Sequence, residues 1–404
     1  MTAALAMVEL DGVAQRLVIC PPDVASQHVP SIIAKAGVDV LVSDGERGEK
    51  GAGGLTPRVH AGASLSPCGP AALSPVATQW VLLTSGTTGE PKMLLHDLAG
   101  LTGAIKPGQL DGPDVVWGTF YDIRRYGGLQ IFLRALLGNR PLVLPDPAES
   151  PTDHLVRLGA HGVTHLTGTP SHWRRALMNP AVRAIAPRYI RLSGEIADQA
   201  ILDALRSVFP AAAIGHAYAS TEGGVSFEVT DGREGFPADL FGRKGEVEMK
   251  VENGSLRIRS SRTARGYLGE PESVLADNDG FVDTADIVQQ RGDRYYFLGR
   301  RSGIINVGGL KVHPEEVEAR INGHPAVLMS CVRSQRNPIT GALVVADIVL
   351  KERESCGNGK GRELEQEILS HCRKALPRHK VPAALRFVKA LGLTETGKMG
   401  RPHA

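Results

Sequence analysis

The segment with the clearest chemical character is residues 84–92, which read TSGTTGEPK. Its two glycines permit a tight turn that brings backbone N–H groups to a polyanion, while hydroxyls add donors and a lysine adds positive charge. The lysine precedes Met93 rather than serine or threonine, which disfavours the common P-loop of GTPases and ATPases. We therefore expect a phosphate-binding loop of another kind, made by Thr84, Ser85, Gly86, Thr87, Thr88, Gly89 and Lys92.

Five further segments follow this loop and combine glycines with charged or aromatic residues. They are residues 193–195 (SGE), 217–222 (AYASTE), 283–286 (DTAD), 299–318 (beginning GRRS and containing GGLKVHPEEVE) and 394–401 (TETGKMGR). With residues 84–92, and in this order, they resemble the signature motifs of the adenylate-forming superfamily, which includes acyl- and aryl-CoA synthetases, peptide-synthetase adenylation domains and beetle luciferases. The resemblance covers residues 80–401 and departs from the usual glycine at Ala219 and Ala285.

The resemblance implies a reaction in two steps. A carboxylate attacks the α-phosphate of ATP and pyrophosphate leaves, and a thiol then takes the acyl group and releases AMP. We expect an ATP-dependent carboxylate–CoA ligase that uses ATP, Mg²⁺ and CoA and acts on an aryl or short to medium acyl acid. Two alternatives stay open: a stand-alone adenylation enzyme that loads a carrier-protein phosphopantetheine, and a non-catalytic adenylate-binding protein.

The resemblance also implies roles for single residues. Lys398 would offset the charge that builds on the α-phosphate in the first step, Glu222 would bind Mg²⁺, and Thr221 would donate to the α-phosphate. Tyr218 would offer its ring to adenine, while Asp286 and Arg300 would bind the ribose. The remaining residues expected on the nucleotide side are Gly194, Glu195 and Ala217.

The acid and thiol sides are expected on other segments. The acid pocket should include Tyr121, Thr167 and Gly168, and the neighbouring Arg124 and Arg125 either bind a second carboxylate or CoA phosphate, or pair with surface acids. The resemblance implies that the C-terminal domain rotates about a hinge at Ser302, where the family more usually has Asp or Lys. That rotation would present Gly308, Gly309 and Lys311 to the adenylate on the thiol side.

Hydrophobic periodicity predicts the elements that position these residues. Helical patterns alternate with short apolar strands up to about residue 214, which is typical of a mostly parallel sheet. From residue 246 two alternating runs flank Asn253-Gly254, which predicts an antiparallel hairpin. We expect an α/β fold with a large N-terminal domain at residues 1–301 and a small mobile α+β domain at residues 302–404. Residues 45–78 lack periodicity and are expected to form a loop.

Composition narrows the class of protein. Of 404 residues, 42% are hydrophobic and 22% charged, with a net charge of +3, which excludes a disordered chain and disfavours a nucleic-acid partner. Five widely spaced cysteines, no basic leader and no long apolar run predict unpaired thiols, no membrane span and a cytoplasmic protein. The histidines lack metal-binding spacing. The sequence leaves open whether the chain forms a homodimer. In the family a much longer region precedes the phosphate loop, so the resemblance implies a compact enzyme with a shortened N-terminal region.

Overall fold

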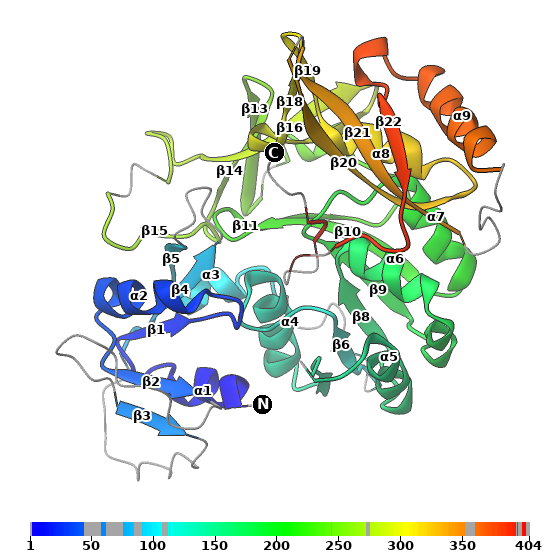
Figure 1. Ribbon diagram of the computed structural model, residues 1–404. Coiled ribbons are helices and arrows are strands. Elements are labelled where there is room, and N and C mark those ends of the chain that lie inside the picture. The colour runs from blue at the N-terminus through cyan, green and yellow to red at the C-terminus, as the bar shows by residue number, and fades with distance from the viewer. Residues whose placement is uncertain are drawn as a thin grey trace.

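The computed structural model describes residues 2–43, 58–61, 76–84, 91–106, 112, 114–146, 148–243, 245–271, 275–338, 340–351, 360–392, 394 and 398–400. Figure 1 shows a large body built on several sheets, with a smaller C-terminal unit packed against it. Within the described residues, no helix combines the length and the apolar character that crossing a bilayer requires. Cys20, Cys331 and Cys372 are free thiols, as predicted, whereas Cys68 and Cys356 lie outside the described residues.

The strands of the first hundred residues belong to two separate sheets. The elements are α1 (Thr2–Leu10), β1 (Arg16–Ile19), η1 (Ser26–His28), α2 (Val29–Ala36), β2 (Val40–Ser43), β3 (Arg58–Ala61), β4 (Gln79–Thr84), β5 (Lys92–His96) and α3 (Leu98–Thr102). β1 pairs in parallel with β4, whereas β2 pairs with β3 in a separate sheet. The prediction that residues 45–78 lack strands is therefore wrong for β3, whose short run could not reveal its distant partner.

A six-stranded sheet, in the order β11-β10-β9-β8-β6-β7, carries most of the predicted site. Its strands are β6 (Trp117–Thr119), β7 (Leu142–Val143), β8 (His165–Gly168), β9 (Tyr189–Ser193), β10 (Ala213–Ser220) and β11 (Gly224–Val229). All neighbours run parallel except β10 and β11. This confirms a mostly parallel sheet, whose carboxyl-terminal edge is the usual place for a ligand.

Helices cover both faces of this sheet (Figure 1). They are α4 (Tyr126–Leu137), α5 (Pro151–Ala160), α6 (Pro170–Met178), η2 (Pro180–Ala184) and α7 (Gln199–Val208). Side chains of α5, α6 and α7 share a core with Leu166, Ile190 and Leu192, whereas α4 packs against Trp117 and Tyr189 on the opposite face. Strand alternation thus sends neighbouring residues of β9 to different helix layers.

Antiparallel structure follows, as the predicted turn at Asn253 and Gly254 indicates. The strands and the short helix η3 are β12 (Phe236–Pro237), η3 (Ala238–Leu240), β13 (Val247–Glu252), β14 (Ser255–Ser260), β15 (Gly266–Tyr267), β16 (Val282–Arg291) and β17 (Arg294–Arg300). Positive φ angles of 52° at Asn253 and 77° at Gly254 match the hairpin turn between β13 and β14. β12, β13, β14, β16 and β17 form one sheet, and β15 instead joins β5.

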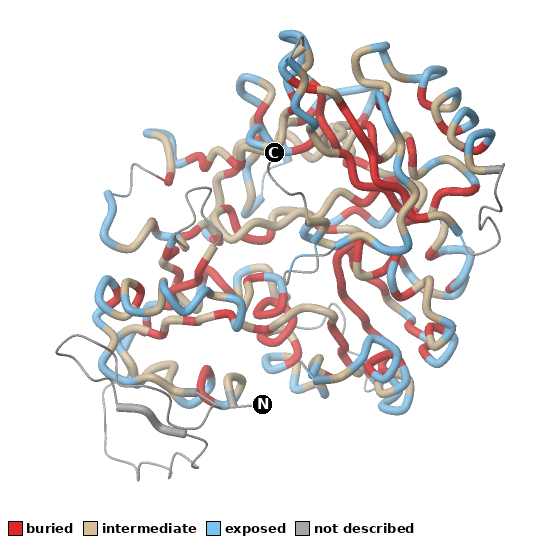
Figure 2. Tube along the Cα trace, in the orientation of Figure 1, coloured by how far each residue is buried: buried red, intermediate tan, exposed pale blue. Residues whose placement is uncertain are grey.

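The C-terminal unit has its own core. Its elements are η5 (Arg301–Gly303), β18 (Ile305–Val307), β19 (Leu310–Val312), α8 (Pro314–Asn322), β20 (Val327–Asn337), β21 (Gly341–Leu350), α9 (Lys360–Arg373), η7 (Arg378–Lys380) and β22 (Ala384–Phe387). Leu364, Ile368 and Cys372 of α9 are buried on one helix face, as their spacing predicts. Figure 2 shows the buried strands β20 and β21 beneath this helix. The combination confirms the expected α/β class with a smaller C-terminal unit.

Candidate active site

The loop that carries Lys398 reaches the carboxyl-terminal edge of the six-stranded sheet. Main-chain hydrogen bonds fold the loop on itself, from Thr394 N to Lys398 O at 2.8 Å and from Gly400 N to Gly392 O at 3.0 Å. The Cε atom of Lys398 lies 3.4 Å from the position that a Cβ on Gly194 would occupy, and Gly194 has a φ of +87°. A side chain at residue 194 would therefore be strained and would crowd the lysine.

Glu195, one residue further, joins this loop to the large domain. Its Oε1 atom accepts hydrogen bonds from Met399 N at 2.7 Å and from Ser171 Oγ at 3.0 Å, and its Oε2 atom accepts one from Ser171 N at 2.9 Å. Ser171 lies in the first turn of α6, where free backbone N–H groups favour a carboxylate. The sequence placed Glu195 on the nucleotide side, whereas the structure gives its carboxylate to the Lys398 loop.

The ammonium group of Lys398 lies among charged groups from four other segments. Burial and then the guanidinium of Arg300 lower its pKa below the ordinary value of a lysine, against the opposing effects of Glu195, Asp286 and Glu222. This burial concerns the ammonium group, whereas the residue as a whole is exposed to solvent. The lysine can thus approach an anion bound between these carboxylates and Arg300.

The residues predicted for the nucleoside meet one another. Tyr218 Oη donates to Asp286 Oδ2 at 2.5 Å, and Arg300 Nε lies 3.2 Å from Asp286 Oδ1. The ring of Tyr218 stacks against Phe227 and Phe297, with centroids 5.6 Å and 5.0 Å apart. Burial and the charge of Asp286 raise the pKa of the Tyr218 hydroxyl, so it stays a donor. Ala217, also predicted here, is buried beside Ser193 on β9.

The two alanines that replace the family's glycines adopt different backbone conformations. Ala285 has a φ of +57°, a left-handed conformation that costs a residue with a side chain about 1–2 kcal/mol. Asp283 Oδ1 supports it by accepting from Ala285 N at 2.9 Å and from Ser255 Oγ at 2.6 Å. Ala219 lies at a register shift between β10 and β11 and does not have a positive φ angle. The structure thus keeps the turn before Asp286 without glycine.

Glu222 and Thr221 follow β10 and lie beside the ends of the predicted phosphate loop. Within the described part of the chain no hydrogen bond engages the carboxylate of Glu222, and its charge acts on Lys398, Arg300 and Tyr267. Lys92 lies 5.0 Å from the centroid of the Tyr267 ring, and Thr84 pairs with Lys92 across β4 and β5. Lys92 and Glu222 therefore both act on Tyr267, while Ser85, Gly86, Thr87, Thr88 and Gly89 lie outside the described residues.

This arrangement fits a magnesium ion that arrives with a nucleotide. Mg²⁺ is commonly held by one or two carboxylates together with substrate phosphates. The unengaged Glu222 carboxylate meets that need, and the described residues contain no cluster of three or more acidic, histidine or cysteine ligands that would hold a metal alone.

The predicted acid-pocket residues occupy two faces of the sheet. Tyr121 Oη donates to Ser193 O at 2.8 Å, and burial raises the pKa of this hydroxyl. Thr167 is buried and donates to Thr119 Oγ1 at 3.0 Å on the α4 face. A Cβ on Gly168 would instead lie 2.7 Å from the ring of Phe120, on the α6 face. Gly168 therefore shares the strand with Thr167 but not its side of the sheet.

Arg124 and Arg125 are engaged elsewhere. Arg124 Nε donates to Asp122 Oδ1 at 2.9 Å and its Nη2 atom to Asp122 Oδ2 at 2.7 Å, and Arg125 pairs with Asp23. Of the two expectations for these arginines, the ion pairs with nearby acids match the structure. A cation that the sequence analysis overlooked, Arg191 of β9, is buried next to the Thr167 row of the sheet.

The residues predicted for the thiol side lie in the turn between β18 and β19. Gly308 and Gly309 have φ angles of 56° and 83°, and both are exposed, as is Lys311. Gly308 N donates to Thr340 O at 2.9 Å. Ser302, the predicted hinge, lies in η5 beside Arg301, whose Nη2 donates to Asp283 at 2.9 Å.

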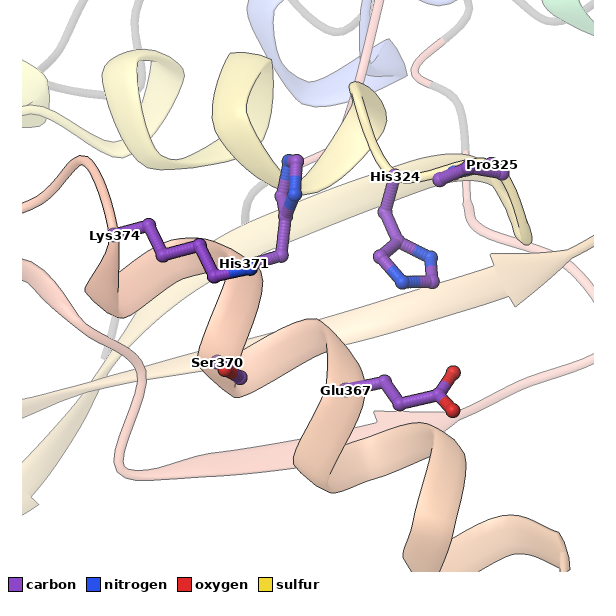
Figure 3. A pocket seen from close by; sticks show the side chains of 6 residues that line it. All are labelled: His324, Pro325, Glu367, Ser370, His371 and Lys374. Atoms are coloured by element: carbon purple, nitrogen blue, oxygen red, sulfur yellow. The ribbon is translucent and has the colours of Figure 1, made fainter.

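A surface hollow of about 320 Å³ lies away from all these groups, between α9 and the end of α8 (Figure 3). The rings of His324 and His371 meet edge to face there, with centroids 5.5 Å apart. None of its lining residues belongs to the predicted site; they are His324, Pro325, Glu367, Ser370, His371 and Lys374.

Comparisons with known proteins agree with this geometry. Residues 4–268 match the family model described as AMP-binding enzyme, which is more than half of the chain. The chain belongs to this family. Residues 316–398 match the model of the AMP-binding enzyme C-terminal domain, so both parts of the family architecture are present.

The relatives and structural neighbours of this family member bear similar names. The 2-succinylbenzoate–CoA ligase of Bacillus velezensis is 24% identical over 417 residues, covering 98% of this chain and 78% of the relative. The mitochondrial acyl-coenzyme A synthetase ACSM5 of Homo sapiens is 32% identical over 173 residues, covering 41% of this chain and only 30% of the relative. The o-succinylbenzoate CoA synthetase of Bacillus subtilis, solved with an acyl-adenylate intermediate, has a TM-score of 0.68 at 18% identity and covers 98% and 84% of the chains. This last likeness shows the fold.

The sequence did not predict a role for Ser171, Met399 or Arg191. Ser171 and the main chain of Met399 carry no side-chain signal of their role, because the contact depends on how two distant segments fold together. Arg191 lies within the strand YIRLS, where a single cation among mostly apolar residues was a visible signal.

Proposed function

We propose that this chain joins a carboxylic acid to CoA through an acyl-adenylate, at the expense of ATP. The observation that carries the proposal is the position of Lys398 among Glu195, Glu222, Asp286 and Arg300. The names of the relatives, which are CoA ligases and synthetases, support the same reaction class. We also propose that the acid is aryl or short to medium acyl and that its acyl group is transferred to CoA. We further propose that the domain boundary lies at Ser302 and that the chain acts in the cytoplasm.

In the first step an oxygen of the carboxylate attacks the α-phosphorus of ATP, and the bond to the bridging oxygen breaks as pyrophosphate leaves. Asp286 and Arg300 orient the ribose, and the Tyr218 hydroxyl fixes the carboxylate of Asp286. Lys398 stabilises the negative charge that gathers on the α-phosphate oxygens. Glu222 would hold Mg²⁺, which would neutralise charge on the phosphates.

In the second step a thiolate sulfur attacks the acyl carbon, a carbon–sulfur bond forms, and the bond to the phosphate oxygen breaks as AMP leaves. The thiol loses its proton in this step. The turn at Gly308 and Gly309 would guide the thiol, which requires the C-terminal domain to leave the position that the Met399–Glu195 contact defines.

The test is exchange of labelled pyrophosphate into ATP with a panel of aromatic, aliphatic and dicarboxylic acids, followed by thioester analysis with CoA and with a phosphopantetheinylated carrier protein. Exchange that needs one class of acid, and thioester formation only with CoA, would support the proposal. Transfer only to the carrier protein would replace CoA as the acceptor. Binding of AMP without exchange for any acid would favour a non-catalytic adenylate-binding protein.

A further inference from the structure

Arg191 lies on the face of the six-stranded sheet that the predicted acid pocket uses. In register it lies opposite Thr167 of β8 and Gly215 of β10, and Thr167 lies opposite Thr119 of β6. Since Ile190 belongs to the core of the α5–α7 layer, strand alternation sends Arg191 to the α4 face. Arg191 therefore extends a polar row, Thr119–Thr167–Arg191, across three strands.

The position of this row along the strand matches the far end of a bound acid. Ser193 ends β9, and its carbonyl oxygen accepts the Tyr121 hydroxyl just before Gly194 meets Lys398. Arg191 precedes Ser193 by two residues, so it lies about 7 Å deeper along the strand. An acid whose reacting carboxylate reaches Lys398 would extend its other end toward Arg191.

The Nε atom of Arg191 is buried without a hydrogen bond to the described residues. The residue is 8% exposed, and within the described part of the chain its Nε atom has no hydrogen bond. The nearest carboxylate oxygen belongs to Glu228 and lies 3.7 Å from Nε, beyond hydrogen-bond distance. Glu228 also accepts the hydroxyl of Tyr189. A buried charge in this condition costs free energy unless an anion arrives.

Three tyrosine hydroxyls lie within reach of the charge of Arg191. Its charge acts on the hydroxyls of Tyr121, Tyr126 and Tyr189, and burial is the main cause that raises the pKa of each. Tyrosine hydroxyls can donate to an anion but cannot neutralise a guanidinium. These hydroxyls supply donors beside the guanidinium of Arg191, and a guanidinium suits an oxyanion with two or more oxygens.

We propose that Arg191 binds a second anionic group, a carboxylate or sulfonate, at the end of the acid distant from the reacting carboxylate. This inference rests on the proposed function and narrows its substrate to acids with two anionic groups. Arg191 then acts as a specificity residue and takes no part in the chemical steps.

The experiment compares pyrophosphate exchange for acids of matched skeleton with and without the second group: hexanoate with adipate, and 4-methylbenzoate with terephthalate. We expect the wild type to favour one of the dicarboxylates over its partner by about tenfold or more in kcat/KM. Arg191→Met should lower kcat/KM for that dicarboxylate about 10–100-fold and leave or raise the value for the monocarboxylate, and Arg191→Lys should restore part of the loss.

Two further variants separate specificity from structure. Glu228→Gln removes the competing carboxylate, so it should leave or improve use of the dicarboxylate, whereas a merely structural ion pair would make Glu228→Gln resemble Arg191→Met. Arg175→Met, an exposed change on α6, is the matched control.

Three outcomes would overturn the proposal. They are a preference of the wild type for the monocarboxylates, an equal loss for both acids in folded Arg191→Met and Arg191→Lys, or a loss in Glu228→Gln that equals the loss in Arg191→Met. Exchange with monocarboxylates alone would leave the ligase function standing and remove the role of Arg191. Silence with every acid would remove both. Thermal melting of each variant shows whether it is folded.

Discussion

The two ends of the C-terminal unit differ in what they touch. Its last loop inserts Lys398 beside Gly194 and ties Met399 N to Glu195. Its first turn, at Gly308 and Gly309, is exposed, and a Cβ on either glycine would meet no atom within 4 Å. The same small unit thus presents one end to the nucleotide site and keeps the other in solvent.

This difference explains how one unit could serve two steps in turn. The docked end carries a cation, which suits the charge that gathers on phosphate in the first step. The free end carries two glycines in the left-handed region, whose turn has no side chain to obstruct a thiol. We infer that this structure corresponds to the arrangement for adenylate formation, and that thioester formation requires the Glu195–Met399 contact to break.

The largest effect that would test this division is expected for Lys398→Ala. Loss of one preorganised charge at the transition state should lower the rate of pyrophosphate exchange by about 10²–10³-fold or more. Thioester formation from CoA and a preformed acyl-adenylate should change only a few-fold, because Lys398 belongs to the docked end. Both steps are measured separately, with the exposed Lys374→Ala as the control. Equal losses in the two steps would contradict the division.

A smaller effect is expected for Glu195→Ala, which removes the acceptor of three hydrogen bonds. Hydrogen bonds to charged groups are worth about 1.5–3 kcal/mol, which corresponds to roughly 10–100-fold in kcat for exchange. Because the carboxylate of Glu195 already accepts from Met399 and Ser171, we expect the Kd for ATP to stay close to the wild-type value. Calorimetry and exchange kinetics measure the two quantities, with Glu363→Ala as the control. A raised Kd for ATP with an unchanged kcat would instead indicate that Glu195 binds the nucleotide.

For Gly309→Ala at the free end, we expect the second step to slow and the first step to be largely unaffected. An alanine with a φ of +83° costs about 1–2 kcal/mol, so the turn should distort and thioester formation should slow by roughly tenfold. Exchange should remain within twofold, since a Cβ on Gly309 would meet no described atom within 4 Å and the turn makes no described contact with the nucleotide side. Gly245→Ala, at a glycine with open space and no positive φ, is the control. Slower exchange in Gly309→Ala would place the turn in the first step as well.

The sequence predicted the groups of this site better than it predicted how they meet. The motifs located Lys398, Asp286, Glu222 and Tyr218 because each role demands one residue type near a glycine-rich or acidic segment. Periodicity also predicted helices alternating with strands up to about residue 214, because a helix such as α7 buries one face against the sheet. These predictions depend on short-range pattern, which a single sequence contains.

The rest depends on pairing between distant segments. No local pattern could show that β1 joins β4 rather than β2, that Glu195 accepts from Met399, or that Gly168 faces Phe120 while Thr167 faces Thr119. Ala285 illustrates another limit, since its left-handed conformation is held by Asp283 and not by its own preference. Tertiary contacts, rather than propensity, decide these features.

The smallest expected effect concerns the protonation of the docked lysine. Because burial and Arg300 lower the pKa of Lys398, the ammonium loses its proton at a lower pH than an ordinary lysine. Only the protonated form can offset phosphate charge, so exchange should decline a few-fold as pH rises through the lowered pKa, at a lower pH than an ordinary lysine would give. In Lys398→Arg the guanidinium stays charged, so whatever activity remains should lose this alkaline decline. Thioester formation from preformed adenylate should lack the decline in both proteins. A decline that persists unchanged in Lys398→Arg would assign the titration to another group and remove the ammonium charge as the reason why the docked end serves the first step.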